Sequence, residues 1–356
     1  MTGWRAWLME PKPSIGGRLV RGCLRCLSVP YAAVIGLRNA AYDWKILRVN
    51  QLRIPVICIG NLTVGGTGKT PMVAWLALLL RQKGFRVAIV SRGYGQLASG
   101  SNDEALELEL KLPDVPHLQD PNRVAAGLLA QDELDMQVVV LDDGFQHRRL
   151  ARNLDIVIID ATDPVAAHRL LPGGLMRESW SGLRRARIVL LSRTQLADAK
   201  TLARIETQVA RWSPTAVCAR TWHQPKSVRR FGGEAVDLSS LRDRPILAFC
   251  GIGNPQAFFR MLRSESLQVV AERTWPDHHG YTAADVEQLR AWTQTHPDCA
   301  AVVCTMKDWV KLQIAQLGHL PLLALEIEVG IDPAGRAAIE CLVDELMSSQ
   351  AEPNPV

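Results

Sequence analysis

Residues 54–71 read Ile-Pro-Val-Ile-Cys-Ile-Gly-Asn-Leu-Thr-Val-Gly-Gly-Thr-Gly-Lys-Thr-Pro. The continuous apolar run at residues 54–59 predicts a buried strand, and the apolar pattern of residues 71–80 predicts a helix that ends near Lys83. A glycine-rich turn lies between them, in the strand–turn–helix context that a phosphate-binding P-loop requires. The predicted nucleotide-binding residues are Thr63, Val64, Gly65, Gly66, Thr67, Gly68, Lys69 and Thr70.

The residue types of this turn suit a nucleoside triphosphate. The glycines let backbone N–H groups point inward, and the N-terminus of the following helix favours an anion. We expect Lys69 to reach the β- and γ-phosphates and the Thr70 hydroxyl to bind Mg²⁺. Thr63 stands where the pattern has glycine, so a glycine-rich structural turn is the alternative. Val64 occupies the position of the second lysine of the partitioning ATPases, which disfavours that class.

The rest of the chain alternates strand-like and helix-like segments. This alternation predicts an α/β fold, with a P-loop NTPase-like, mostly parallel sheet core and a second, smaller α/β lobe. The predicted strands are residues 87–90, 138–141, 156–159, 188–191, 246–250, 267–271, 301–304 and 322–327. Helices are predicted at residues 123–130, 256–262, 283–293, 309–316 and 334–347, and residues 222–240 are interpreted as a connector. We predict an N-terminal segment at 1–50, a P-loop core at 51–215, the smaller lobe at 216–350 and a tail at 351–356.

Two adjacent carboxylates follow the strand at residues 138–141. Asp142 and Asp143 are expected at the carboxyl end of a parallel strand, where α/β sheets bind ligands. An apolar strand that ends in Asp downstream of a P-loop is a Walker-B-like arrangement for Mg²⁺. Adjacent residues on a strand face opposite ways, so the sequence leaves open which of the two binds the metal.

Composition excludes several classes of protein. The 356 residues are 47% hydrophobic and 22% charged, which is inconsistent with a disordered or collagen-like chain. The net charge of +5 is too small to indicate a nucleic-acid-binding protein by itself. Eight scattered cysteines indicate a reducing compartment rather than a disulfide framework, and we expect no zinc site.

The positive charge is concentrated at the N-terminus. Residues 1–50 contain eight Lys and Arg against two acids, so the other 306 residues carry a net charge of −1. Arg18, Arg21 and Arg25 recur at helical spacing, and Trp and Tyr side chains flank them. No run reaches the ~18 apolar residues that a membrane span needs. A basic amphipathic helix suits an anionic membrane surface, and a helix packed on its own domain is the alternative.

These motifs together resemble the tetraacyldisaccharide 4'-kinases, the lipid A 4'-kinases of Gram-negative bacteria. The resemblance spans nearly the whole chain, and Leu141-Asp-Asp-Gly-Phe-Gln-His147 is its most specific motif. It also includes residues 61–71, 91–95, 155–160, 171–178, 249–255 and 277–279, and Lys307-Asp308. The resemblance implies ATP- and Mg²⁺-dependent phosphorylation of the 4'-hydroxyl of a tetraacylated glucosamine disaccharide 1-phosphate. It further implies a peripheral enzyme on the cytoplasmic face of the inner membrane, attached to the anionic surface by its N-terminal helix.

The resemblance also assigns roles to individual residues. Asp103 matches the catalytic base of the family, although Asn102 and Ala105 replace the usual neighbours. His278 matches the histidine that supports this base, and Lys69 completes the catalytic set. Asp142 and Asp143 match the Mg²⁺/ATP acids. Further candidates for the substrate or active site are Arg92, Gln146, His147, Arg177 and Glu178, the last two in a turn where Gly173, Leu175 and Met176 depart from the family form.

Two other classes of function remain open on the sequence. One is a nucleotide-dependent switch or assembly factor, which needs no small-molecule acceptor. The other is a soluble small-molecule kinase, which the basic N-terminal segment disfavours. No nucleic acid and no obligate protein partner is expected.

Overall fold

The computed structural model describes residues 7–8, 14–93, 103–163, 168–277 and 279–349. The chain forms two compact units, and both are discontinuous in sequence. The larger unit comprises residues 4–94, 111–222 and 329–356, and the smaller unit comprises 1–3, 95–110 and 223–328. Two of the passages from one unit to the other lie within strands β7 (Val217–Arg229) and β13 (Leu320–Ile331). The domain boundaries expected from the sequence are linear and stay a prediction.

The larger unit is built on a parallel sheet with the strand order β7-β6-β5-β1-β4-β2-β3. Its inner strands are apolar on both faces, as expected of strands that helices cover on both sides. Its strands besides β7 are β1 (Val56–Asn61), β2 (Val87–Ser91), β3 (His117–Gln119), β4 (Val138–Asp142), β5 (Leu154–Asp160) and β6 (Ile188–Ser192).

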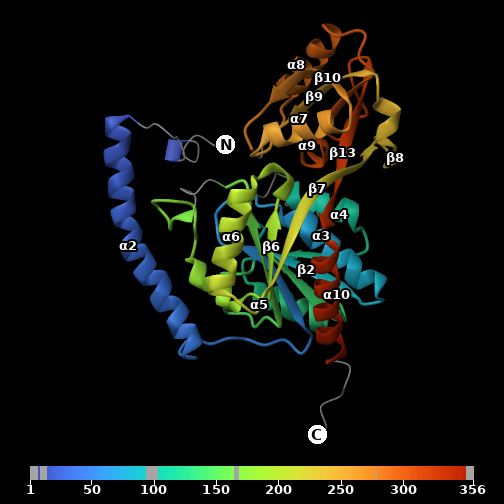
Figure 1. The fold of residues 1–356 in the computed structure, drawn as a ribbon. Helices are drawn as coiled ribbons and strands as arrows, with labels where there is room; N and C mark the ends of the chain where they lie inside the picture. The colour runs from blue at the N-terminus through green and yellow to red at the C-terminus, as the bar shows by residue number, and fades with distance from the viewer. Residues whose placement is uncertain (1–6, 9–13, 94–102, 164–167, 278, 350–356) are drawn as a thin grey trace. The chain divides into compact units, whose positions relative to one another are not determined.

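Helices flank this sheet on both faces (Figure 1). Helices α5 (Arg123–Asp132) and α6 (Ala199–Trp212) pack on the face that carries Val56 and Cys58. Helix α3 (Lys69–Gln82) follows the glycine-rich turn, and α10 (Pro333–Ser348) buries Ile339, Val343 and Met347. The N-terminal helix α2 (Ile15–Asp43) begins at the N-cap Ser14, whose side chain accepts a hydrogen bond from the Gly17 N–H.

The smaller unit has a second parallel sheet with the order β10-β9-β11-β13. Helix α7 packs on one face, and helices α8 and α9 pack on the other. Its elements are α4 (Asp103–Lys111), β8 (Ala235–Val236), β9 (Pro245–Cys250), α7 (Pro255–Ser264), β10 (Gln268–Thr274), α8 (Ala283–Gln294), β11 (Ala301–Thr305), α9 (Met306–Leu312) and β12 (Gln316–Leu317). The prediction of an α/β fold with a mostly parallel sheet, a second α/β part and an N-terminal helix is confirmed.

Two expectations about single elements are wrong. The predicted connector at residues 222–240 is largely strand, because β7 continues through Pro225 to Arg229. Proline and polar residues obscure this strand in the sequence, and its mixed burial shows that it is not enclosed like the central strands. Helix α9 ends at Leu312 rather than at 316, because Gln313 adopts a left-handed conformation and residues 316–317 pair with β13.

Helix α2 also changes one inference about membranes. The sequence lacks an uninterrupted apolar run, yet this 29-residue helix is long and apolar enough to cross a bilayer by length and composition. Only 6% of its most apolar window is buried within the protein. One such helix near the N-terminus is weak evidence for a span, so its contacts must decide its role.

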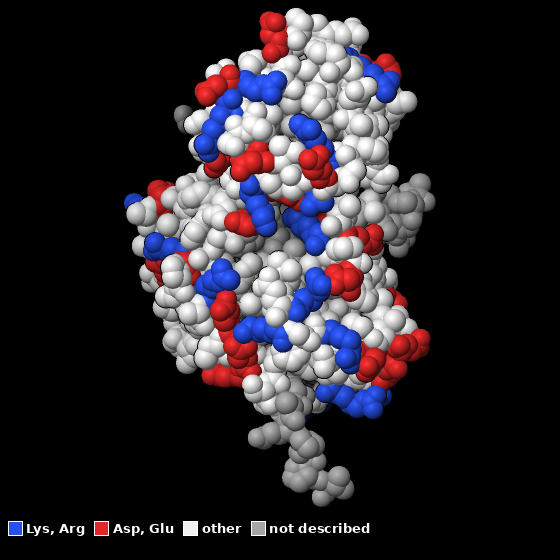
Figure 2. All heavy atoms as spheres, turned by 90° about the vertical axis from the view of Figure 1, so that its right-hand side faces the viewer, with Lys and Arg blue, Asp and Glu red and all other residues white. Residues whose placement is uncertain are grey.

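Surface charge is mixed elsewhere. On the face shown in Figure 2, Lys and Arg side chains are interspersed with Asp and Glu and form no extended patch of one sign. All eight cysteines are free, and Cys58, Cys250 and Cys304 are core residues as expected.

Candidate active site

The glycine-rich turn connects β1 to α3, as the sequence predicts. Gly68 is the N-cap of α3 and has a φ of 87°, a left-handed conformation that glycine adopts without strain. The Thr67 and Thr70 side chains are buried, whereas Gly65 and Gly66 are exposed. The turn therefore presents backbone at the surface of the unit while its threonines anchor it.

The carboxylates lie beside this turn. Strand β4 ends at Asp142, which pairs in register with Ile59 of β1. Asp143 follows with a φ of 50°, and its carboxylate lies 3.5 Å from the Lys69 Nζ. Arg177 donates to both oxygens of Asp143, at 3.0 and 2.7 Å. Burial alone would raise the pKa of Asp143, but Lys69 and Arg177 outweigh it and hold that pKa well below its usual range.

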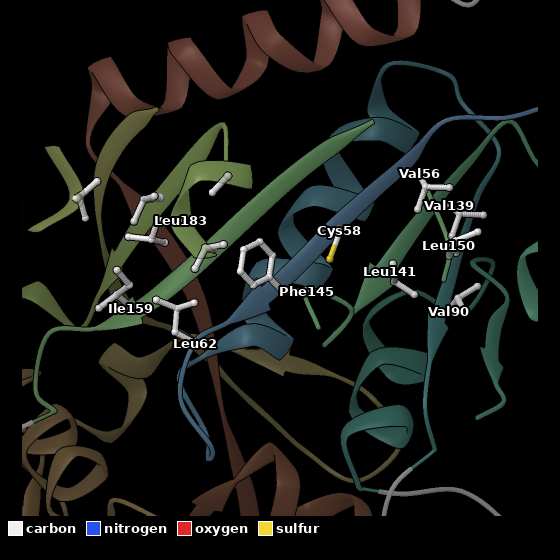
Figure 3. Close-up of a cluster of buried hydrophobic side chains, with 14 of the residues drawn as sticks. Val56, Cys58, Leu62, Val90, Val139, Leu141, Phe145, Leu150, Ile159 and Leu183 are labelled. Carbon is white, nitrogen blue, oxygen red and sulfur yellow. The ribbon is translucent and has the colours of Figure 1, made fainter. Parts of the chain in front are cut away.

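Phe145 fixes the position of the acidic turn. Its ring lies in the hydrophobic core close to Cys58 of β1 (Figure 3), and it is fully buried. A side chain at Gly60 would place a Cβ 2.6 Å from the Phe145 Cβ, so only glycine allows this approach. The guanidinium of Arg185 lies 4.3 Å from the ring centroid. The apolar residue of the Asp-Asp-Gly-Phe motif thus anchors the polar ones.

A polar network joins four of the predicted residues, namely Lys69, Gln146, Arg177 and Glu178. The Gln146 amide donates to Glu178 at 2.8 Å and to the Asn61 carbonyl at 2.9 Å. Glu178 is buried and forms an ion pair with Arg185 at 2.7 Å. The Asn61 side-chain oxygen accepts from Lys69, at 3.4 Å, and from Arg177. No role was predicted for Asn61, although a polar residue at the end of a buried strand was a usable signal.

A second group of basic residues gathers on the other side of the acidic turn. The Arg123 Nη1 lies 3.5 Å from the His147 Nδ1. Burial, and then the charge of Arg123, lowers the pKa of His147 to about 4, so its ring is neutral at pH 7. Burial and then the charge of Arg92 lower the pKa of Arg123. Arg92 itself is exposed just after β2.

Arg123 is the functional candidate that sequence reasoning missed, since it was interpreted only as the first residue of a helix. Its side chain is only 7% exposed, and its Nε has no hydrogen-bond partner. Among the residues that the structure describes, no carboxylate forms an ion pair with Arg123. A buried guanidinium without such a partner is costly unless it serves a ligand.

The turn at residues 171–178 connects helix α2 to the acidic site. The Ser28 Oγ accepts a hydrogen bond from the Gly173 N–H at 3.0 Å, and the Tyr31 hydroxyl donates to the Arg177 carbonyl at 2.8 Å. A Cβ at Gly173 would lie 2.7 Å from the Ser28 Oγ, so glycine permits this close contact. The Arg38 side chain donates to the Gln146 carbonyl at 2.8 Å. Helix α2 is therefore attached to the backbone of residues that surround Asp143.

In the smaller unit, Asp308 connects two loops. It accepts hydrogen bonds from the Gly251 N–H at 3.0 Å, the Tyr281 hydroxyl at 2.9 Å and the Thr305 hydroxyl at 2.6 Å. Its side chain is fully buried, and burial raises its pKa. The Asp308 of the Lys307-Asp308 motif therefore has a structural role within the unit.

The two expected acid–base residues are not described in full. Asp103 is the first residue of α4, but its side chain lies outside the described part of the structure. His278 lies outside the described residues. Within the described ranges, no group of three or more His, Cys, Asp and Glu side chains is arranged to hold a metal ion.

Comparison with known proteins identifies the family. The family model described as tetraacyldisaccharide-1-P 4'-kinase matches residues 20–344. The chain belongs to this family. A tetraacyldisaccharide 4'-kinase of Geobacter metallireducens is 38% identical over 350 residues, which cover 93% of this chain and 99% of that protein. A second, of Anaeromyxobacter sp. strain K, is 34% identical over the whole chain and 98% of its own length.

A solved structure of the family agrees with the fold. The crystal structure of LpxK from Aquifex aeolicus in complex with ATP has a TM-score of 0.74 and 29% sequence identity, and the match covers 92% of this chain and 99% of that one. As a tetraacyldisaccharide 4'-kinase, the protein is a phosphotransferase of lipid A biosynthesis. The alternatives of a nucleotide-dependent switch and of a soluble small-molecule kinase are not favoured.

Proposed function

We propose that this kinase transfers the γ-phosphate of ATP to the 4'-hydroxyl of a tetraacylated glucosamine disaccharide 1-phosphate at a membrane surface. The single observation that carries the proposal is the convergence of Lys69, Asp143 and Arg177 beside the exposed backbone of Gly65 and Gly66. Two cations and a carboxylate at a P-loop are suited to bind a triphosphate and its metal ion. The related LpxK that was crystallised with ATP supports the choice of nucleotide.

Different residues of the larger unit are proposed to bind the phosphates and the metal ion. Residues Thr63–Thr70 hold the β- and γ-phosphates, with Lys69 exchanging Asp143 for phosphate oxygens. The Thr70 hydroxyl and the Asp142 carboxylate are the oxygen donors that suit Mg²⁺. We assign the direct metal contact to Asp142, because it ends the apolar strand β4 downstream of the P-loop, which is the Walker-B-like position. Bound Mg²⁺ would supply charge neutralisation on the β- and γ-phosphates.

The acceptor hydroxyl needs a base and a cationic environment. Asp103 is the proposed base, and His278 is proposed to orient it or to tune its pKa. Arg92, Arg123 and the neutral His147 provide donors for the oxygens of the transferred group or of the sugar phosphate. Positioning and electrostatic neutralisation are the main sources of rate enhancement in phosphoryl transfer.

The contacts of α2 favour a helix that lies on a membrane rather than one that crosses it. Ser28, Tyr31, Arg38 and Asn39 all bond to the larger unit, so half of the helix is attached to a folded globular part. A bilayer-spanning helix cannot keep such contacts along its length. The helix also exposes large apolar side chains, namely Ile15, Leu19, Val20, Leu27, Val29, Val34 and Leu37.

This arrangement suits the lipid substrate. The acyl chains of the acceptor stay in the bilayer, so that the protein needs to bury only the sugar phosphate. The basic residues of α2 favour an anionic surface. The free cysteines suit a reducing compartment, which supports the cytoplasmic face of the inner membrane.

The decisive experiment incubates the protein with γ-labelled ATP and Mg²⁺ and with one of three acceptors. These are the lipid disaccharide 1-phosphate in detergent micelles, soluble glucosamine phosphates, or none. We expect label on the lipid only, and no transfer without Mg²⁺. Equal nucleotide hydrolysis with and without lipid would contradict the proposal and favour a switch.

A further inference from the structure

Two residues at the end of β6 contact the outer side of the phosphate-binding turn. The Ser192 hydroxyl donates to the Thr67 carbonyl at 2.9 Å, and both residues are buried. The Arg193 Nη2 donates to the Gly66 carbonyl at 3.0 Å. Two successive carbonyls of the turn are thus held by two successive residues of a neighbouring strand end.

A buried carboxylate holds Arg193 in place. Asp160 ends β5, pairs in register with Ser192, and forms an ion pair with the Arg193 guanidinium. The other oxygen of Asp160 accepts from the N–H and the hydroxyl of Thr162, at 2.9 and 2.7 Å. Arg193 spans both acceptors because the planar guanidinium carries donors in a fixed fork, which a lysine ammonium lacks.

The backbone of Arg193 is unusual as well. Its φ of 57° lies in the left-handed region, which an L-residue other than glycine adopts only at a cost. Non-glycine residues in such conformations persist where the surroundings determine them, and they gather at functional sites. Neither Arg193 nor Asp160 belongs to the set of residues that we propose to contact the nucleotide phosphates.

These contacts have a consequence for the direction of the backbone donors. In a planar trans peptide the carbonyl and the N–H point in opposite directions. The carbonyls of Gly66 and Thr67 are drawn outward, so the N–H groups of Thr67 and Gly68 face the opposite side. Glycine-rich backbone does not fix these directions by itself, because glycine is conformationally permissive.

We propose that Arg193, held by Asp160, is a positioning residue that orients the Thr67 and Gly68 N–H groups for the phosphates before the nucleotide arrives. Ser192 serves the same purpose at the next peptide. This inference rests on the proposed function, since it presumes that the turn binds nucleotide phosphates. Its benefit is preorganisation, which improves affinity by reducing the ordering cost of binding.

The test compares Arg193→Met, Arg193→Lys and Asp160→Asn with the control Arg220→Met. Arg220 lies on the adjacent strand β7 and pairs with Glu206, without contact to the turn. Nucleotide affinity is measured with Mg·ADP, and steady-state kinetics give the KM for ATP and for the lipid acceptor. We expect Arg193→Met to raise the Kd for ADP and the KM for ATP by about tenfold or more, the value of one charge-assisted hydrogen bond. Arg193→Lys restores part of this loss, and the acceptor KM and the control stay near wild type.

A purely structural ion pair is distinguished by thermal unfolding with and without Mg·ADP. Loss of a structural pair lowers Tm equally in both conditions, whereas loss of the positioning contact reduces the increase in Tm that ADP produces. If Arg193→Met does not fold, Ser192→Ala removes only one hydroxyl and must change the ADP affinity in the same direction. An ADP affinity within twofold of wild type in a folded variant overturns the inference. Failure of the wild-type protein to bind nucleotide would instead overturn the proposed function.

Discussion

At the scale of single residues, burial and neighbouring cations have opposite effects on the ionisation of Asp143 in the acidic turn. Asp143 is half-buried, which alone would favour its neutral form, yet two cations keep it ionised. The same cations are the groups that a triphosphate requires. In the proposed mechanism, Lys69 changes partner from the Asp143 carboxylate to the phosphate when nucleotide binds.

The first prediction concerns the proposed base. Asp103→Ala should leave the Kd for Mg·ATP unchanged and reduce kcat by about 10²–10⁴-fold, because a general base acts on the acceptor hydroxyl. Isothermal titration and initial-rate kinetics measure the two quantities. The control is Glu109→Ala, an exposed acid on the same helix. A variant with near-normal kcat would remove Asp103 from the mechanism.

The second prediction is that replacing Arg123 lowers activity without lowering stability. Among the described residues this buried guanidinium has no ion pair with a carboxylate, so its replacement by methionine should keep or raise the free energy of unfolding, since a desolvation cost disappears. The kcat/KM for the lipid kinase reaction should fall at least tenfold. Urea titration and kinetics test both changes.

The matched control for Arg123 is Arg152→Met. The Arg152 side chain is 7% exposed and pairs with Asp155 at 2.9 Å. Its loss leaves a buried carboxylate unpaired and should cost about 3–5 kcal/mol of stability. Equal destabilisation by both substitutions would mean that Arg123 has a structural role.

The lowered pKa of His168 predicts that the stability of the protein depends on pH. Burial, and then the charge of Arg204, lowers its pKa to about 4 from an ordinary value near 6.5. Between these values the unfolded chain binds more protons than the folded one, so stability falls as the pH falls from about 6.5 to 4. Urea midpoints at pH 7, 6 and 5 should decrease in the wild type and decrease less in His168→Gln. An identical pH profile in both proteins would refute this assignment.

At the scale of elements, helix α2 has polar side chains that bond to the rest of the larger unit and apolar side chains that are exposed. Its polar contacts attach it to the larger unit, and its exposed apolar side chains remain for another surface. We predict that the triple variant Leu27→Ser, Val34→Ser and Leu37→Ser sediments less with anionic vesicles, because three exposed apolar side chains are lost. The fold should be unaffected, since none of the three is buried.

The control for α2 replaces Phe231 and Val270 of the smaller unit by serine. Both side chains are more than half exposed, so the change in surface hydropathy is comparable. Their replacement should leave vesicle binding unchanged. If the α2 variant sediments like the wild type, the helix is not the membrane contact.

The elements also show what the sequence could predict. The central strands were predictable because residues such as those of β1 and β4 are apolar on both faces and lie between turn signals. Strand β7 was missed because it combines Pro225 with polar neighbours and is only partly covered. Its pairing depends on residues far away in the chain, and local propensity does not encode such pairing.

In the candidate site, too, local motifs were predictable and contacts between distant residues were not. The turn at residues 63–70 and the pair Asp142-Asp143 were predictable because their motifs are contiguous. Arg123 was not predictable, because its significance arises from its burial and from the lack of an ion pair with any carboxylate of the described residues, which are tertiary properties. Asn61, Arg185 and Arg193 likewise acquire their roles from contacts with residues that are distant in the sequence.

At the scale of the whole molecule, the chain order makes the larger unit dependent on its last helix. Helix α10 returns to the larger unit after the smaller one is complete, and it buries Ile339, Val343 and Met347. These three side chains contribute about 5–9 kcal/mol by their burial. A typical domain has a total stability of about 5–15 kcal/mol, so a chain that ends at residue 222 should not fold.

The division into units predicts that nucleotide binding and phosphoryl transfer can be separated. Residues 63–70, Asp142 and Asp143 belong to the larger unit, whereas Asp103 belongs to the smaller one. Trp222 lies against Gly330, where a Cβ would meet its ring at 2.3 Å, so residues 223–328 can be replaced by a short Gly-Ser loop. With residues 95–110 replaced by a Gly-Ser segment of equal length, this chain should unfold cooperatively and bind Mg·ADP, yet transfer no phosphate to the lipid. Circular dichroism, calorimetric titration and the labelled-ATP assay measure the three properties. A folded chain that does not bind ADP would show that the nucleotide site needs the smaller unit, because every group proposed to hold the phosphates would still be present.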